Sequence, residues 1–213
     1  MDFPIISNDH PLLLASASTR RKRLLEQLGL PFVSLPGSAE EDLSSDEPFF
    51  GTLRVAEKKA RSILPLSRLG WVLGADTVVV LDQAILGKPQ DHNEALSALS
   101  RLSGREHRVF TGFCLLNPQE KIAHAEAVET IVKFRGLTRK EVEAYIATGE
   151  PFGKAGSYAI QGIGAFMVEG IIGSYTNVVG LPLCALIRAL VAEGALPAFP
   201  LAQSLSAAEF QRE

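Results

Sequence analysis

Residues 71–81 read Trp71-Val72-Leu73-Gly74-Ala75-Asp76-Thr77-Val78-Val79-Val80-Leu81, an apolar run that predicts a buried strand. Its one ionisable side chain is Asp76. A carboxylate among apolar neighbours needs a cation, a metal ion or a role in chemistry to keep it there. Gly74 and Ala75 leave space for a close approach to the backbone, as at a ligand site. These residues alone support a functional acid and a structural Asp at a strand end equally.

The segments on either side of this run alternate between strand and helix patterns. Capping-box spacings at Asp91/Glu94 and at Thr138/Glu141 mark the starts of two of the helices. Further strands are expected at 12–15, 31–35, 84–86, 105–116, 121–134 and 165–169, and helices at about 19–28, 52–64, 91–103, 138–148 and 182–193. The two long strands flank residues 117–120 and predict an antiparallel hairpin. The pattern predicts an α/β or α+β sheet protein.

Composition limits the class of protein. The chain has 213 residues, is 46% hydrophobic and carries a net charge of −3. It can therefore bury a large core, and it offers no general field for nucleic acid. We expect an N-terminal extension at 1–11, one domain of two lobes at 12–196 and a C-terminal tail at 197–213. Cys114 and Cys184 are expected to be buried free thiols. No apolar stretch approaches the roughly 18 residues of a membrane span, so we expect a cytoplasmic protein.

Several positively charged residues suggest a phosphate site. Ser16-Ala17-Ser18-Thr19-Arg20-Arg21-Lys22-Arg23 places hydroxyls and cations at a strand-to-helix junction, where backbone N–H groups are free to bind an anion. Lys88 and Lys154, each beside a glycine, are further candidates, although each taken alone fits a surface lysine better. The chain contains neither Gly-x-x-x-x-Gly-Lys-Ser/Thr nor Gly-x-Gly-x-x-Gly after its first strand. ATPase and dinucleotide-binding folds therefore lack their main support.

Acidic and amide groups add two further candidates. The four histidines have no zinc spacing, but Asp76 with Glu40, Glu41 or Asp42 could supply oxygen ligands for Mg²⁺. The amide of Gln161 can pair with the imide edge of uracil or thymine, or it can satisfy neighbouring backbone groups. The seven glycines between Gly149 and Gly173 indicate unusual backbone angles or close contact around it.

Six motifs in order resemble the Maf family of nucleoside triphosphate pyrophosphatases. They are Leu-Ala-Ser-Ala-Ser-Thr-Arg-Arg (14–21), Gly-Ala-Asp-Thr-Val-Val (74–79), Gly-Lys-Pro (87–89), Leu-Ser-Gly-Arg-Glu-His-Arg-Val-Phe-Thr-Gly (102–112), Lys-Ala-Gly-Ser-Tyr-Ala-Ile-Gln-Gly (154–162) and Gly-Ser-Tyr-Thr-Asn-Val-Val-Gly-Leu-Pro (173–182). The resemblance implies a two-lobed α/β mixed sheet with flanking helices, of the inosine-triphosphate-pyrophosphatase-like type, and a nucleotide cleft between the lobes. It also implies hydrolysis between the α- and β-phosphates.

The resemblance implies roles for individual residues. Asp76 matches the catalytic proton acceptor, and Glu41 and Lys59 match an acidic loop residue and a helix lysine. The specificity positions of the dTTP/UTP branch are matched by Arg20, Thr77 and Gln161. We expect the triphosphate to be held by Ser16, Arg21, Lys88 and Lys154. A divalent cation, Mg²⁺ or Mn²⁺, would bridge it to Glu41 and Asp76.

Two other functions are open at this stage. The first is a nucleotide-binding regulator of cell division or septum formation with little catalysis. The second is a nucleic-acid binder that uses residues 20–23, which the acidic charge balance disfavours. We expect a nucleotide as the small-molecule partner, with no nucleic acid and no membrane. The oligomeric state is left open, with a homodimer as one option.

Overall fold

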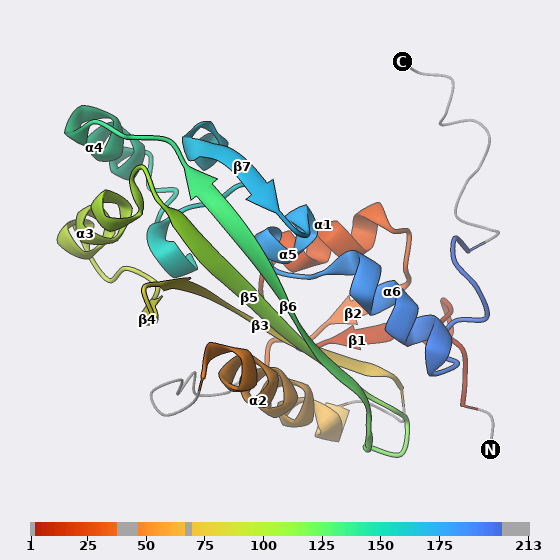
Figure 1. Ribbon diagram of the computed structural model, residues 1–213. Helices are drawn as coiled ribbons and strands as arrows, with labels where there is room; N and C mark the ends of the chain where they lie inside the picture. The colour runs from red at the N-terminus through yellow and green to blue at the C-terminus, as the bar shows by residue number, and fades with distance from the viewer. Residues whose placement is uncertain (1–2, 38–46, 67–69, 202–213) are drawn as a thin grey trace.

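A computed structural model describes residues 3–37, 47–66 and 70–201. Within them one seven-stranded sheet runs in the order β2-β1-β3-β5-β6-β7, and β4 pairs with β3 off this path (Figure 1). The strands are β1 (Leu12–Leu14), β2 (Phe32–Ser34), β3 (Val72–Leu81), β4 (Ala84–Leu86), β5 (Glu106–Leu116), β6 (Ile122–Phe134) and β7 (Val168–Ile172). The β1 strand pairs in parallel with β2 and β3, and the other pairings are antiparallel. The predicted mixed α/β sheet and its long β5–β6 hairpin are confirmed.

The β3 strand is buried along almost its whole length, and one of its edges has an unpaired stretch in the middle. Along one edge it pairs with β5 from Val72 to Val80. Along its other edge it pairs with β1 only at Val72 and Leu73, and with β4 only from Val79 onward. Between these two pairings, no described strand covers the edge at 74–78. Side chains from both faces of β3 can therefore reach the same space at that edge.

The α2 helix (Pro48–Ser62) covers one face of the sheet and packs against β3 and β5. Two glycines allow this close approach. A Cβ atom at Gly74 would overlap the carbonyl oxygen of Ala56, and one at Gly112 would lie 2.6 Å from the carbonyl carbon of Thr52. The helix begins four residues before the expected Thr52, because Pro48 is a suitable first-turn residue that periodicity alone does not weigh.

The opposite face carries two separate hydrophobic cores, which form the two lobes. The first core includes Leu73 and Ala75 of β3 and packs against α1 (Thr19–Gln27) and α6 (Leu183–Ala192). The second includes Val79 and Leu81 and packs against α3 (His92–Leu102) and α4 (Arg139–Ala147). Thr77 lies on β3 between the two sets, and it is half-buried. A polar gap therefore separates the lobes at the centre of the strand.

The helix ends agree with the sequence at most positions. Ser18 caps α1, Asp91 caps α3, and Thr138 forms the predicted capping box with Glu141 at α4. At α3 the second half of the predicted box is absent, because Glu94 accepts from the N–H of Gln90 instead. The last helix starts at Leu183, so Pro182 is its N-cap and not its first residue.

Two other predictions were wrong. Residues 163–167 form a 3₁₀ helix where a strand was expected at 165–169, and the strand β7 starts only at Val168. Gln161 lies in a bend before this turn. Gly164 packs against the hydroxyl of Tyr145 and the carbonyl oxygen of Ala159, and this close packing favours a compact turn. Cys114 is buried as expected, whereas Cys184 is exposed, because it lies on the outer side of α6.

The described end segments pack on the first core. Phe3 contacts it, Ile6 is buried in it, and the indole N–H of Trp71 donates to the carbonyl of Pro4 at 2.9 Å. Ala195 and Leu196 are buried beyond the end of α6. Among residues 3–37, 47–66 and 70–201, no helix is both long enough and apolar enough to cross a membrane.

Candidate active site

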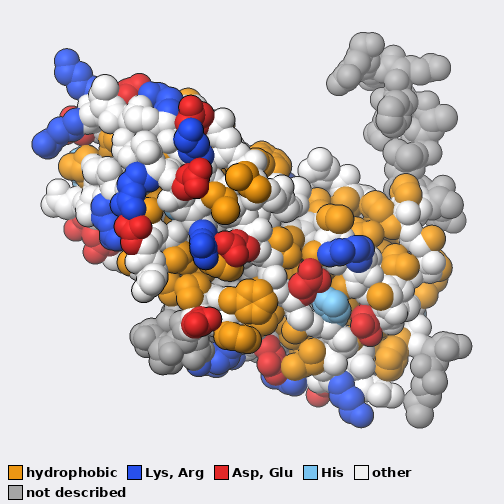
Figure 2. All heavy atoms as spheres, viewed as in Figure 1, with side chains coloured by type: hydrophobic (Ala, Val, Ile, Leu, Met, Phe, Trp, Pro, Cys, Tyr) orange, Lys and Arg blue, Asp and Glu red, His pale blue; other side chains and the backbone are white. Residues whose placement is uncertain are grey.

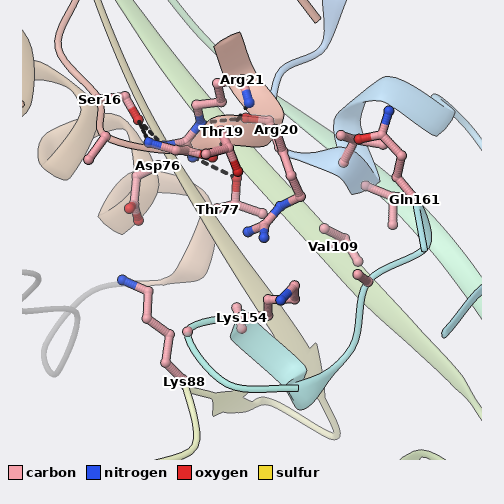
Figure 3. A pocket seen from close by; sticks show the side chains of 18 of the residues that line it. Ser16, Thr19, Arg20, Arg21, Asp76, Thr77, Lys88, Val109, Lys154 and Gln161 are labelled. Atoms are coloured by element: carbon pink, nitrogen blue, oxygen red, sulfur yellow. Dashed lines mark hydrogen bonds between the residues drawn. The ribbon is translucent and has the colours of Figure 1, made fainter. Parts of the chain in front are cut away.

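A cavity of about 470 Å³ opens at the unpaired edge of β3, between the two lobes (Figure 3). The sequence-predicted residues that line it come from the β1–α1 junction, α2, β3, the turn after β4 and the glycine-rich segment. They are Ser16, Arg20, Arg21, Lys59, Asp76, Thr77, Lys88, Lys154 and Gln161. Glu41, expected as a metal ligand together with Asp76, and its alternatives Glu40 and Asp42 lie outside the described residues. The fold thus brings together residues that are up to 145 positions apart in the sequence.

Asp76 forms an ion pair at one end of the cavity. Its Oδ1 atom accepts from the Nζ atom of Lys59 on α2 at 2.7 Å, and both side chains are largely buried. The close packing of α2 at Gly74 brings the lysine to this depth. The other oxygen, Oδ2, is buried and has no hydrogen-bond partner among the described residues. It is the atom through which Asp76 can still accept a hydrogen bond, a proton or a metal ion.

Arg21 connects three of the elements around the cavity. Its Nε atom donates to the carbonyl of Gly180 at 2.7 Å, Nη1 to the Oγ atom of Ser16 at 3.3 Å, and Nη2 to the Oγ1 atom of Thr77 at 3.0 Å. The guanidinium is buried. Arg21 therefore positions neighbouring groups and contributes positive charge to the cavity, and most of its donors are engaged within the protein.

The hydroxyl of Thr77 has a fixed direction. Thr111 on β5 donates its only hydroxyl proton to the carbonyl of Asn177 at 2.9 Å. Thr77 and Thr111 are also hydrogen-bonded, at 2.9 Å, so Thr77 must be the donor in that pair. Thr77 also accepts from Arg21. Towards a ligand in the cavity, the Oγ1 atom of Thr77 can therefore act only as a hydrogen-bond acceptor.

The other cations and Gln161 are spread across the cavity. Figure 3 shows Asp76 and Lys88 on one side, Gln161 on the opposite side, and the head groups of Arg20 and Lys154 between them. Burial lowers the pKa of the Arg20 guanidinium, and the nearby charge of Glu150 opposes that shift. Burial and the charge of Arg20 likewise lower the pKa of Lys154. Crowded, partly buried cations of this kind favour an anionic ligand, which would offset both effects.

A divalent cation fits one part of this site. No group of three or more His, Cys, Asp or Glu side chains suited to a metal ion occurs in the part of the chain that the structure describes. However, Mg²⁺ commonly binds through one or two carboxylates and the phosphates of a substrate. The Oδ2 atom of Asp76, which has no hydrogen-bond partner among the described residues, is a suitable hard-oxygen ligand. A cation at this end would need the substrate to complete its coordination.

Sequence reasoning missed three residues that shape the cavity. Thr111 fixes the hydroxyl of Thr77, while Tyr145 and Glu150 hold the segment that carries Gln161. Glu150 follows Gly149 at the end of α4 and resembles an ordinary solvated acid. The glycines that follow it in the sequence were the one sign of a special role, because they leave room for the Glu150 carboxylate.

Comparison with known proteins identifies the family of this chain. Residues 11–193 match the family model described as Maf-like protein. A protein of Syntrophotalea carbinolica named dTTP/UTP pyrophosphatase is 48% identical over 90% of this chain and 89% of its own length. Two further proteins of that name, from Ruminiclostridium cellulolyticum and Geobacter sp. (strain M21), are 49% and 50% identical over 81% and 87% of this chain, and over 90% and 96% of their own lengths.

One solved structure, titled as a nucleoside-triphosphatase / dITP/XTP pyrophosphatase of Mycobacterium abscessus, superposes with a TM-score of 0.43 at 17% identity. It covers 85% of this chain and 96% of that one, and the similarity is too low to indicate a shared activity. The family match spans both lobes and every described cavity residue. The chain belongs to the Maf-like protein family.

Proposed function

We propose that this protein hydrolyses dTTP and UTP to the nucleoside monophosphate and pyrophosphate. The observation that carries the proposal is the cavity itself, where one acid, whose second carboxylate oxygen has no hydrogen-bond partner among the described residues, lies with several cations from separate elements. The names of the relatives support the substrate class. Modified pyrimidine nucleotides with the same base edge are included in the proposal.

In the proposed reaction a water oxygen attacks the α-phosphorus, and the bond to the oxygen that bridges the α- and β-phosphates breaks. The pyrophosphate leaves with that bridging oxygen. Asp76 orients the water through Oδ2 and accepts its proton, while Lys59 holds Oδ1. Lys88, Lys154 and the first turn of α1 offset the negative charge that develops on the leaving group.

A divalent cation is part of the proposal. Asp76, with Glu41 from outside the described residues, would hold Mg²⁺ or Mn²⁺ against the phosphates. The ion would neutralise charge and lower the pKa of a bound water. The protein's own residues still determine where the nucleotide lies, because the cations and Gln161 come from the two different lobes.

Base recognition is proposed for the opposite end of the cavity. Uracil and thymine present an N3–H donor between two carbonyl acceptors. The amide of Gln161 can accept from N3–H and donate to a carbonyl, and Arg20 is a further donor. The Oγ1 atom of Thr77 is a hydrogen-bond acceptor, so it also suits a base that carries an N–H donor. Cytosine lacks the N3 proton, so we expect CTP to be a poorer substrate.

The remaining expectations are part of the same proposal. We place the activity in residues 12–196, in the cytoplasm, without nucleic acid as a partner and with a homodimer as one assembly to test. On the face in Figure 2, acidic and basic side chains are interspersed, and that face shows no extended basic track for a polyanion. Exposed ion pairs such as Arg108–Glu129 and Lys133–Glu169 also balance basic side chains with acidic ones. No observation favours the rival function of a septum regulator with little catalysis.

One experiment tests the reaction. Purified protein is incubated with Mg²⁺ and a panel of nucleoside triphosphates, and pyrophosphate is separated from orthophosphate. We expect pyrophosphate and monophosphate, with dTTP and UTP used best. Orthophosphate together with a nucleoside diphosphate would contradict the proposed bond cleavage. Nucleotide binding with no released phosphate would instead support the regulatory function.

A further inference from the structure

One carboxylate beside the cavity, Glu150, holds the segment that carries Gln161. Its Oε1 atom accepts from the backbone N–H of Ile163 at 3.0 Å. Its Oε2 atom accepts from the N–H of Gly164 at 2.8 Å and from the hydroxyl of Tyr145 at 2.8 Å. Both oxygens are therefore occupied by donors, and two of those donors lie just after Gln161 in the chain.

The chain before Gln161 is held by the same pair of residues. The hydroxyl of Tyr145 accepts from the N–H of Ala159 at 3.1 Å while it donates to Glu150. The backbone carbonyl of Glu150 also accepts from the Nζ atom of Lys154. The Tyr145–Glu150 pair thus fixes the backbone on both sides of Gln161.

The fit between this pair and the segment is tight. A Cβ atom at Gly162 would overlap the Glu150 carboxylate, and one at Gly164 would lie 2.7 Å from the hydroxyl of Tyr145. Burial acts to raise the pKa of Glu150, but the hydrogen bonds from Gly164, Tyr145 and Ile163 bring it below its ordinary value. The carboxylate is therefore ionised and accepts from all three donors at neutral pH.

We propose that Glu150, with Tyr145, is a positioning residue that sets base preference by fixing where the amide of Gln161 meets the base. The inference rests on the proposed function, in which Gln161 reads a pyrimidine. Gln161 is exposed, and it lies in a bend outside any ladder of strand hydrogen bonds. Its backbone position therefore depends on these side-chain contacts. A displaced amide would distinguish poorly between the N3–H of uracil and the bare N3 of cytosine.

The first test variant is Glu150→Gln. A glutamine has one acceptor oxygen and one NH₂ group, and whichever way it is oriented its NH₂ meets a donor from Tyr145, Ile163 or Gly164. We expect the UTP-to-CTP ratio of kcat/KM to fall about 10- to 100-fold, mainly through a higher KM for UTP. Tyr145→Phe removes the contact to Ala159 and should act in the same direction.

The matched control is Glu141→Gln on α4, the helix that Glu150 follows. Glu141 also accepts three hydrogen bonds, from Arg135 and from the N–H and hydroxyl of Thr138, but none of them comes from the Gln161 segment. This variant should keep the wild-type ratio. In a Gln161→Ala background, Glu150→Gln should cause little additional change in the ratio, because the group that it positions is gone. Additive effects would indicate a general structural role and would overturn the proposal.

A second measurement does not depend on catalysis. Hydrogen exchange at the amides of Ile163 and Gly164 should be at least about 10-fold faster in Glu150→Gln than in the control. If the variants fail to fold, unprotected amides at these positions in the wild-type protein would overturn the inference. If the wild-type protein is active and Glu150→Gln leaves the UTP-to-CTP ratio of kcat/KM unchanged, the inference is also overturned. If the wild-type protein releases no pyrophosphate, the proposed function itself is contradicted.

Discussion

The two ends of the cavity are built in different ways. At the Asp76 end, the key groups stand on regular elements, with Asp76 on β3 and Lys59 on α2. At the Gln161 end, the chain forms bends and short 3₁₀ turns, which side-chain hydrogen bonds from Tyr145 and Glu150 hold in place. Backbone ladders and close helix packing fix the first end, whereas a few polar side chains fix the second.

This difference separates two requirements of a nucleotide hydrolase. Chemistry at a phosphorus atom needs groups held within a fraction of an ångström, and rigid elements provide that. Base recognition can be altered by changing a short segment without disturbing the sheet. We therefore expect changes near Asp76 to affect turnover or stability, and changes near Gln161 to affect the choice of base.

The largest expected effect is at Asp76. Asp76→Asn keeps the shape of the side chain but removes the base, so kcat for UTP should fall about 10²- to 10⁴-fold while nucleotide binding remains. Pyrophosphate release and calorimetric titration measure the two quantities. Asp82→Asn is the control, because Asp82 lies just beyond β3 and pairs with Arg105 outside the cavity. A nearly active Asp76→Asn protein would remove the residue from the proposed role.

The next effect concerns His107. Its Nε2 atom is hydrogen-bonded at 2.8 Å to the hydroxyl of Tyr158, a residue that lines the cavity. Burial lowers the pKa of His107 from 6.5 to about 4. The unfolded chain therefore takes up this proton at a higher pH than the folded protein does. The free energy of unfolding should fall by roughly 3 kcal/mol on this account as the pH drops from about 7 to 4.

Urea unfolding at several pH values tests this expectation. His107→Phe keeps an aromatic ring against Phe134 but cannot be protonated. The difference in stability between wild type and variant should stay constant above pH 7 and should shift in favour of the variant as the pH falls. Parallel curves across the whole range would show that His107 does not titrate with a lowered pKa.

A smaller loss of stability is expected at the Asp76 end from Gly74→Ala. The new methyl group would push α2 away from β3, so the free energy of unfolding should fall by roughly 1–3 kcal/mol, toward the upper limit. Turnover should fall as well, because Lys59 would move from Asp76. Gly136→Ala is the control, since nothing lies within 4 Å of an added Cβ there. Equal stability of the two variants would contradict the close packing.

The smallest effect is expected from Thr111→Val. The hydroxyl of Thr77 would lose its acceptor and could turn its proton toward the cavity, where cytosine presents an acceptor. The UTP-to-CTP ratio of kcat/KM should fall about 3- to 10-fold, or roughly 1 kcal/mol. Thr130→Val is the control, because Thr130 anchors the same helix, α5 (Tyr175–Val179), through Asn177 without touching Thr77. An equal change in both variants would point to loosening of α5 instead.

The elements with strong local patterns were predictable from the sequence. Two long runs of strand-forming residues and the connection at 117–120 predicted the β5–β6 hairpin, and the Thr138/Glu141 spacing predicted the cap of α4. The glycine-rich segment was not predictable in the same way. Residues 165–169 have strand-like composition, but the contacts of Gly164 with Ala159 and Tyr145 favour a 3₁₀ turn instead.

For the candidate site, the sequence by itself determined the chemical groups: an acid in a buried strand, cations at a helix start and beside glycines, and an amide among glycines. Each of these is visible in a short window, because residue type and local spacing do not depend on the fold. Only the tertiary structure decided their partners, such as Lys59 for Asp76, Thr111 for Thr77 and Glu150 for the Gln161 segment. These partners come from distant or irregular parts of the chain, and they meet because β3 leaves an unpaired edge between two separately packed lobes.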